Sequence, residues 1–130
     1  MNIRKGIFIM SEGQEQLLET IMGLIMHGGD AKSSAMEAIY AAKAGNFEEA
    51  DEKIEAADEA LGNAHKSQTG LLTQEASGDS VEISLLLVHG QDHLMNAITT
   101  KDLALEIIDV YRKLDGQDIL EDMDAITLRQ

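Results

Sequence analysis

Residues 47–72 read FEEADEKIEAADEALGNAHKSQTGLL and carry an unusually regular hydrophobic pattern. Its steps alternate between three and four residues, which predicts a helix that packs along one narrow seam, as helices do in a coiled coil. The opposite face is mostly acidic between Glu48 and Glu59, with only Lys53 to offset it, and this pattern favours a solvated surface over a binding site. The seam consists of Phe47, Ala50, Ile54, Ala57, Leu61, Ala64, Gln68 and Leu71.

Upstream of this stretch, the sequence predicts one long helix with an irregularity in its middle. Ser11 followed by Gln14 matches a capping box, so we expect the helix to begin there. The GGD at residues 28–30 interrupts the apolar pattern and predicts a kink or a short break, after which the helix resumes. Gly45 suits the left-handed position that ends a helix, and Asn46 suits the cap of the next one.

Downstream, a loop at residues 76–80 precedes a third predicted helix, which we expect to run from about residue 81 to 114 and to end at Gly116. Asp79 with Glu82 offers its capping box. The apolar residues of this segment cover a broad arc instead of one stripe, and a helix of that kind is buried on more than one side. Two companion helices cannot bury all of that surface, so the sequence predicts self-association through the third helix.

The composition agrees with an all-α fold in a single domain. The 130 residues include no proline, and helix formers dominate. We therefore expect an antiparallel three-helix bundle whose first helix is kinked. Cysteine is absent, which excludes disulfides and thiolate metal sites. The predicted organisation is an N-terminal extension at 1–10, a three-helix domain at 11–116 and an acidic C-terminal tail at 117–130.

The net charge of −14 excludes nucleic acid as a ligand class, because phosphate backbones are bound by basic surfaces. A basic protein partner is compatible with this charge, so an adaptor that recruits such a partner through the acidic face is one functional hypothesis. The apolar run at 7–10 is too short for a signal peptide, and the run at 83–88 is too short to span a membrane. These features predict a soluble, cytoplasmic protein.

The sequence HGQDH at residues 89–93 places three titratable groups within five residues of the predicted third helix. Imidazole and carboxylate groups cost free energy to bury without partners, so a helix built only for packing rarely carries them together. His89, Asp92 and Asn96, with a threonine at 99 or 100 after them, recur at three- to four-residue steps and share one helix face. This polar face is the candidate functional site.

A metal site and a structural site are two interpretations of these residues. His89 and His93 have the four-residue spacing at which two imidazoles bind one ion, and Asp92 lies beside them, although no third strong ligand is near in sequence. In the structural interpretation the histidines only hydrogen-bond to their neighbours. We expect that role for His27 and His65.

A phosphoryl carrier is the third interpretation. A neutral imidazole is a good nucleophile at physiological pH, and it can take a phosphoryl group on one ring nitrogen while the other donates a hydrogen bond. His89 would be that nucleophile. Gly90 would leave room for the close approach of a partner protein, and Gln91 and His93 could donate hydrogen bonds to the phosphoryl group.

Four stretches of the chain carry a resemblance to a known family. They are GGDAKS (28–33), AGNF (44–47), AHKSQTGLL with EASG behind it (64–72 and 75–78), and VHGQDHLM (88–95). Together they closely resemble the lactose/cellobiose-type enzyme IIA of the bacterial phosphoenolpyruvate-dependent sugar phosphotransferase system. The HGQDHLM run is highly specific in that setting. The resemblance covers about residues 12–114, so residues 1–10 and 115–130 extend past the family core.

The resemblance implies a three-helix protomer that assembles as a homotrimer, with the last helices around the threefold axis. It implies that His89 accepts a phosphoryl group from the phosphocarrier HPr and passes it to enzyme IIB, from which it reaches incoming lactose, cellobiose or a related disaccharide. The chain would then be a phosphotransferase component that meets the membrane only through the permease. Gln91 and His93 match motif positions, and we expect them to stabilise the phosphoryl group.

Asp92 matches the aspartate whose three copies meet on the axis in that family and share one divalent metal ion per trimer, usually magnesium. Three converging carboxylates repel strongly at low dielectric, and a hard cation with oxygen ligands removes that conflict. Asp92 is therefore expected to hold the ion and not to act in catalysis. The rival hypotheses are a helical metal-binding bundle that uses His89, His93 and Asp92, and the acidic adaptor.

Overall fold

The structure, a computed structural model, describes residues 9–128, with side chains described up to residue 116 and at 123 and 124. Three helices account for nearly all of this part of the chain: α1 (Glu12–Lys43), α2 (Phe47–Ala76) and α3 (Leu85–Leu128). No strand occurs between residues 9 and 128, so the predicted all-α three-helix fold is confirmed. Most of the predicted N-terminal extension, residues 1–8, lies outside the described residues.

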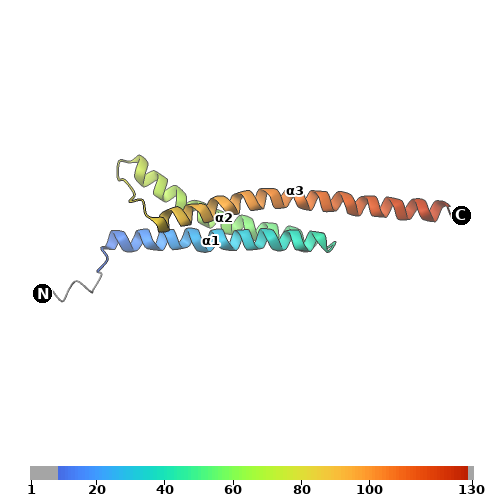
Figure 1. Cartoon of the computed structure of the whole chain (residues 1–130), viewed down its shortest axis with the longest axis horizontal. Coiled ribbons are helices and arrows are strands. Elements are labelled where there is room, and N and C mark those ends of the chain that lie inside the picture. Colours follow the sequence, from blue (N-terminus) through green and yellow to red (C-terminus); the bar gives the residue numbers. More distant parts are fainter. Residues whose placement is uncertain (1–8, 129–130) are drawn as a thin grey trace.

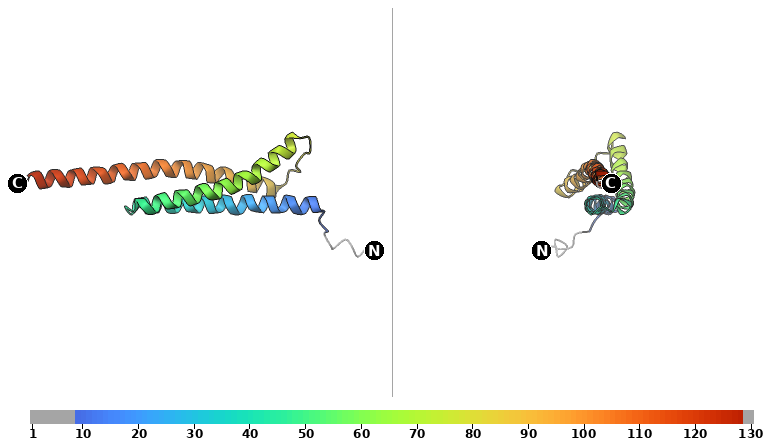
Figure 2. Two further views of the ribbon diagram at one scale, coloured as in Figure 1. Left: turned by 180° about the vertical axis from the view of Figure 1, so that it is seen from behind. Right: turned by 90° about the vertical axis from the view of Figure 1, so that its right-hand side faces the viewer.

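α2 runs antiparallel to α1, and α3 runs antiparallel to α2, so α1 and α3 point in the same direction (Figures 1 and 2). α1 is the helix that makes most of the contacts in the bundle. It packs extensively against both α2 and α3, whereas α2 and α3 contact each other much less. The C-terminal part of α2 leans away from the other helices, and α3 projects past the closed end of the α1–α2 hairpin (Figure 1). One long face of α3 is therefore left without a partner in the protomer.

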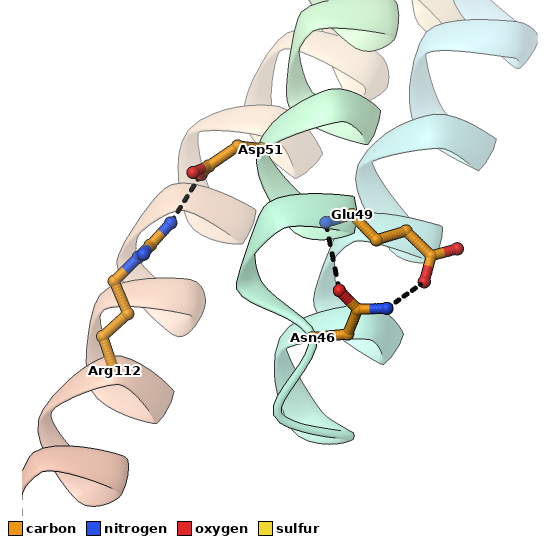
Figure 3. A network of polar contacts seen from close by, with 4 residues as sticks. All are labelled: Asn46, Glu49, Asp51 and Arg112. Carbon is orange, nitrogen blue, oxygen red and sulfur yellow. Dashed lines mark hydrogen bonds and ion pairs between the residues drawn. The ribbon is translucent and has the colours of Figure 1, made fainter.

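The ends of α1 and α2 follow the predicted local signals. The Ser11 hydroxyl accepts from the backbone N–H of Gln14, and the Gln14 Oε1 accepts from the backbone N–H of Ser11, so the capping box is confirmed. Gly45 has a φ of 82°, the left-handed conformation that glycine adopts without steric cost. The Asn46 Oδ1 accepts from the Glu49 backbone N–H, and the Asn46 Nδ2 donates to the Glu49 carboxylate (Figure 3).

The predicted break at residues 28–30 is wrong, because α1 is one continuous helix from Glu12 to Lys43. Figures 1 and 2 show this helix running straight, without the kink that was the other expectation. Gly28 is buried, and a Cβ built there would lie 3.1 Å from the backbone carbonyl carbon and oxygen of His93. Glycine at this position lets the backbones of α1 and α3 approach each other. The sequence signal was real, but it marks a close helix contact and not a helix end.

Both predicted ends of the third helix are also wrong. α3 begins at Leu85, where the hydroxyl of Ser84 accepts from the backbone N–H of Leu87 at 3.1 Å, so Asp79 does not cap it. The helix also continues through Gly116 to Leu128. A glycine inside a helix costs only about 1 kcal/mol relative to alanine, which helix formers on both sides can offset. The predicted acidic tail is thus helical up to Leu128.

The core changes in character along the bundle. Around α3 residues 87–94 it consists of large aliphatic side chains, and Leu24 and Leu94 are fully buried there. Further along, the buried residues are mostly alanines such as Ala35, Ala57 and Ala104, which allow close helix approach, with partly buried larger side chains packed against them. The predicted seam of α2 is confirmed, because Ala50, Ala57, Ala64 and Leu71 are its buried residues.

Three ion pairs connect the helices across the bundle surface. Lys53 Nζ lies 2.8 Å from Glu37 Oε2, and this hydrogen-bonded carboxylate raises the pKa of Lys53. Lys101 on α3 binds Asp58, and Arg112 binds Asp51 (Figure 3). Exposed pairs of this kind contribute little to stability, typically about 0–1 kcal/mol each. The acidic side chains of α2 are exposed as predicted.

The predicted excess of apolar surface on the third helix is present in the protomer. Leu85 is 87% exposed, and Leu103 and Val110 are more than half exposed. Most of these side chains lie on the side of α3 that faces neither α1 nor α2. Among the described residues, no helix combines the length and the apolar character that crossing a bilayer requires.

Candidate functional site

The predicted polar face of α3 lies on the unpartnered side of the helix. His89, Asp92 and Asn96 are all exposed and follow each other at helical spacing. Apolar residues continue the same line toward both ends of α3. We call the whole line the α3 seam, and it consists of Leu85, His89, Asp92, Asn96, Thr99, Leu103, Ile107, Val110 and Leu114, each of them exposed.

His89 and His93 form a pair of imidazoles one helical turn apart. Their Nε2 atoms lie 3.2 Å apart, and the rings meet edge to face at a centroid distance of 4.5 Å and an angle of 79°. A hydrogen bond between two neutral imidazoles requires that one nitrogen carries the proton and the other presents a lone pair. When His93 donates, the Nε2 of His89 holds the lone pair and its own proton lies on Nδ1. That tautomer is the nucleophilic one at Nε2.

Gln91 does not join this pair within the protomer. Residues two positions apart on a helix point to opposite sides, and Gln91 faces α2 while His89 faces solvent. The Nε2 of Gln68 donates to the Oε1 of Gln91 at 2.8 Å in a half-buried hydrogen bond. Sequence reasoning missed this partner, although Gln68 is the single polar residue in the seam of α2. That position was the available signal.

The prediction that Gly90 leaves room for a partner protein is wrong. Gly90 is buried, and a Cβ there would lie 3.4 Å from the Cγ2 and the carbonyl oxygen of Ile21 and from the Cβ of Leu24. The missing side chain therefore makes room for α1. Gly28 and Gly90 together bring α1 and α3 into close contact on either side of the imidazole pair.

A shallow cavity of about 350 Å³ lies beside His93 in the groove between α1 and α3. It is lined by Gly29, Lys32 and Ser33 of α1 and by Asp92, His93 and Asn96 of α3. The cavity combines one ammonium, one carboxylate, a hydroxyl, an amide and an imidazole. It is polar, open to solvent on one side, and continuous with the face that carries His89.

Asp92 is the candidate metal ligand, and the protomer alone does not complete a site around it. Nowhere in the described part of the chain do three or more His, Asp or Glu side chains gather closely enough to hold a metal ion. The rival hypothesis of a metal bound within one chain by His89, His93 and Asp92 is therefore not supported. A hard cation that keeps several water ligands needs only a few carboxylate oxygens. An exposed Asp92 from each of several protomers fits that requirement.

The two remaining histidines stand apart from this site. His65 is exposed on α2, so the expectation of a buried, hydrogen-bonded residue is wrong for it. His27 is half-buried and lines a separate hollow between α1 and α2, together with Asp30 and Glu59. His89 and His93 are thus the two histidines of the described structure whose rings contact each other.

The comparisons with known proteins agree on one family. A family model described as "PTS system, Lactose/Cellobiose specific IIA subunit" matches residues 19–112. The chain is 53% identical over 108 residues to the lichenan-specific phosphotransferase enzyme IIA component of Bacillus subtilis (strain 168), covering 83% of this chain and 96% of that protein. It is 48% identical over 102 residues to the cellobiose-specific EIIA component of Lactococcus lactis, covering 78% of this chain and 88% of the relative.

Solved structures give the same result. The PTS cellobiose-specific enzyme IIA from Bacillus anthracis superimposes with a TM-score of 0.76 at 48% identity, covering 83% of this chain and 95% of that one. The IIA(chitobiose) subunit of Escherichia coli, solved in complex with HPr, superimposes with a TM-score of 0.67 at 38% identity, covering 76% of this chain and 96% of its own. The chain therefore belongs to the lactose/cellobiose-specific IIA family of the phosphotransferase system, whose members are phosphotransferase components that carry phosphate on a histidine.

Proposed function

We propose that His89 is the histidine that carries the phosphoryl group, accepting it from HPr and passing it to enzyme IIB for the uptake of lactose, cellobiose or a related disaccharide. The observation that supports this assignment is the exposed imidazole of His89, whose Nε2 lies 3.2 Å from the Nε2 of His93. His65 is also exposed, but it has no such partner in the described structure. The relay places the protein in the cytoplasm, where HPr donates to it.

The chemistry needs few protein groups. The lone pair of the His89 nitrogen attacks phosphorus, a nitrogen–phosphorus bond forms, and the bond to the donor breaks with its electron pair leaving on the donor. Transfer to enzyme IIB repeats this step in the other direction. Positioning and charge neutralisation dominate the catalysis of such transfers. His93 is placed to stabilise the phosphoryl group with its N–H, whereas Gln91 can reach it only from around the helix or from a neighbouring protomer.

We also propose that the protein is a homotrimer built on the α3 seam. The α3 seam is exposed along its whole length in the protomer. Its C-terminal half is apolar, from Leu103 through Ile107 and Val110 to Leu114. Large apolar side chains in a continuous exposed line mark an interaction surface. Packing three copies through Asp92 and the apolar residues that follow it along the α3 seam would bring three Asp92 carboxylates together and leave His89 at the edge of the contact, open to HPr. One divalent ion per trimer, magnesium by preference, would offset their repulsion.

Incubation with phosphoenolpyruvate, the general phosphotransfer enzyme and HPr tests the carrier function. We expect intact-mass spectrometry to show one added phosphoryl group per chain, lost in acid and retained in base, as a phosphoramidate on imidazole requires. The matched control omits HPr and should leave the protein unmodified. An adduct that survives acid, or that forms without HPr, would contradict the proposal. Adding the IIB protein encoded beside this chain with its permease then identifies the acceptor and the sugar.

Replacing Asp92 with leucine tests the metal site and the assembly together. We expect native mass spectrometry to show one ion per trimer in the parent protein, and a trimer without the ion in Asp92→Leu, because the variant removes the like charges along with the ligand. Glu55→Leu is the control, since it removes a carboxylate from the exposed face of α2. Monomers from Asp92→Leu would mean that the ion supplies most of the association free energy. One ion per chain in the parent would contradict a shared site.

A further inference from the structure

The cavity beside His93 adds a group that the phosphoryl-transfer site described above does not yet use. His93 belongs to both places, because its Nε2 lies 3.2 Å from the Nε2 of His89 and the residue lines the cavity with Lys32, Ser33 and Asn96. A phosphoryl group on the Nε2 of His89 would take the place that His93 now occupies as hydrogen-bond partner. Its oxygens would then lie next to His93 and toward the cavity.

The negative charge of the whole chain favours a local cation at that place. The net charge is −14, so the field of the protein opposes the arrival of a doubly negative phosphoryl group. Transfer enzymes meet this problem with cations fixed at the reacting group, because charge neutralisation carries most of their catalysis. The ring N–H of His93 can offer a hydrogen bond, whereas an ammonium group offers both a hydrogen bond and a fixed positive charge.

Lys32 is the cation that the structure offers. The three basic residues that bridge helices, Lys53, Lys101 and Arg112, are each bound to a carboxylate. Lys32 forms no ion pair within the described structure, is exposed, and lines the cavity next to Ser33. Its long flexible stem lets the ammonium follow a group that moves. Asp92 is the carboxylate in the same cavity, so a role of Lys32 in offsetting Asp92 has to be separated from a role toward phosphate.

We propose that Lys32 binds the phosphoryl group carried by His89, so that the groove between α1 and α3 forms the anion-binding wall of the transfer site. This inference rests on the proposed role of His89. The ammonium of Lys32 and the hydroxyl of Ser33 approach the phosphoryl oxygens from α1, while the N–H of His93 approaches them from α3. A charge-assisted hydrogen bond of this kind is stronger than a neutral one, and its loss is measurable in rate and in equilibrium.

A charge series at position 32 tests the proposal, with phosphorylated HPr as the donor. We expect Lys32→Gln to lower kcat/KM for phosphoryl uptake about tenfold or more, as loss of one charge-assisted hydrogen bond predicts. Lys32→Arg should restore most of the rate, and Lys32→Glu should be slower than Lys32→Gln. Lys43→Gln is the matched control, because it removes an exposed lysine from the same helix away from the cavity. An equal loss in Lys43→Gln, or none in Lys32→Gln, overturns the proposal.

The Asp92→Asn background separates the two roles of Lys32. If Lys32 binds phosphate, Lys32→Gln lowers the rate by a similar factor whether residue 92 is aspartate or asparagine. If it only offsets the Asp92 charge, the loss disappears in that background and the proposal fails. Far-ultraviolet circular dichroism on each variant identifies any loss of fold. Absence of phosphorylation in the parent protein would instead refute the proposed function, so the two failures are distinct.

Discussion

Replacing His89 with alanine is expected to abolish phosphoryl uptake from HPr completely, without a measurable change in fold. The imidazole is exposed on the unpartnered face of α3, so its removal leaves no cavity and no unpaired buried group. The chemistry, in contrast, loses the atom that forms the bond to phosphorus. Apart from His93, the partner in this pair, no side chain in the described structure holds a ring nitrogen against another imidazole. Intact-mass spectrometry after incubation with phosphoenolpyruvate, the general enzyme and HPr measures the result.

Two further variants define what the loss in His89→Ala means. His93→Ala should still accept phosphate but more slowly, because it removes the hydrogen bond that selects the tautomer of His89 and leaves the nucleophile in place. His65→Ala should behave like the parent protein, because this exposed histidine of α2 lies outside the site. Phosphorylation of His89→Ala at the parent rate would show that another residue is the carrier.

Replacing Gly28 with valine is expected to cause a large loss of stability. A Cβ at this position lies 3.1–3.2 Å from backbone atoms of His93 and Leu94, and backbone inside a helix cannot turn aside as a flexible side chain can. α1 and α3 must therefore separate, which also loosens the packing of the fully buried Leu24 and Leu94. Overpacking of this kind costs about 3 kcal/mol. Urea unfolding followed by circular dichroism measures the change.

The neighbouring glycine provides the control for Gly28→Val. A Cβ at Gly29 meets no atom within 4 Å, and the residue lies in the same helix one position further along. Gly29→Val should therefore change the free energy of unfolding by less than about 1 kcal/mol. Both proteins have to be compared at one protomer concentration, because association contributes to apparent stability. Equal effects of the two substitutions would show that helix propensity, and not close contact with α3, explains the cost.

The sequence was sufficient to predict the helices but not all of their ends. Ser11, Gly45 and Asn46 were read correctly because capping depends on side chains within one turn of the helix end. The glycines at 28 and 116 were misread, because glycine serves equally to end a helix, to admit a neighbouring helix, or to be tolerated at a small cost. Only the position of α3 against α1 distinguishes these cases, and that is tertiary information.

The candidate site shows the same division. The spacing of His89 and His93 was sufficient to predict that they face each other, because residues four apart meet on any helix. The true role of Gly90 and the bond between Gln68 and Gln91 depend on which face of α3 meets which helix. Lys32 was equally invisible, because it comes from another helix and has no spacing relation to the histidines. Contacts along one helix follow from periodicity, whereas contacts between helices do not.

The close contact that Gly28 and Gly90 create has a consequence for how the protein meets its two partners. The proposed phosphoryl-accepting ring, His89, stands near the N-terminal end of a long helix whose backbone packs closely against α1 at Gly28 and Gly90, and not on a loop. The backbone of such a surface has little freedom to change shape between one partner and the next, although side chains such as Lys32 can still move. HPr and enzyme IIB must reach the same nitrogen from the same side in succession. HPr and enzyme IIB are therefore expected to have binding surfaces of similar shape, even if their folds differ. Conformational changes on docking are expected mainly in these two partners.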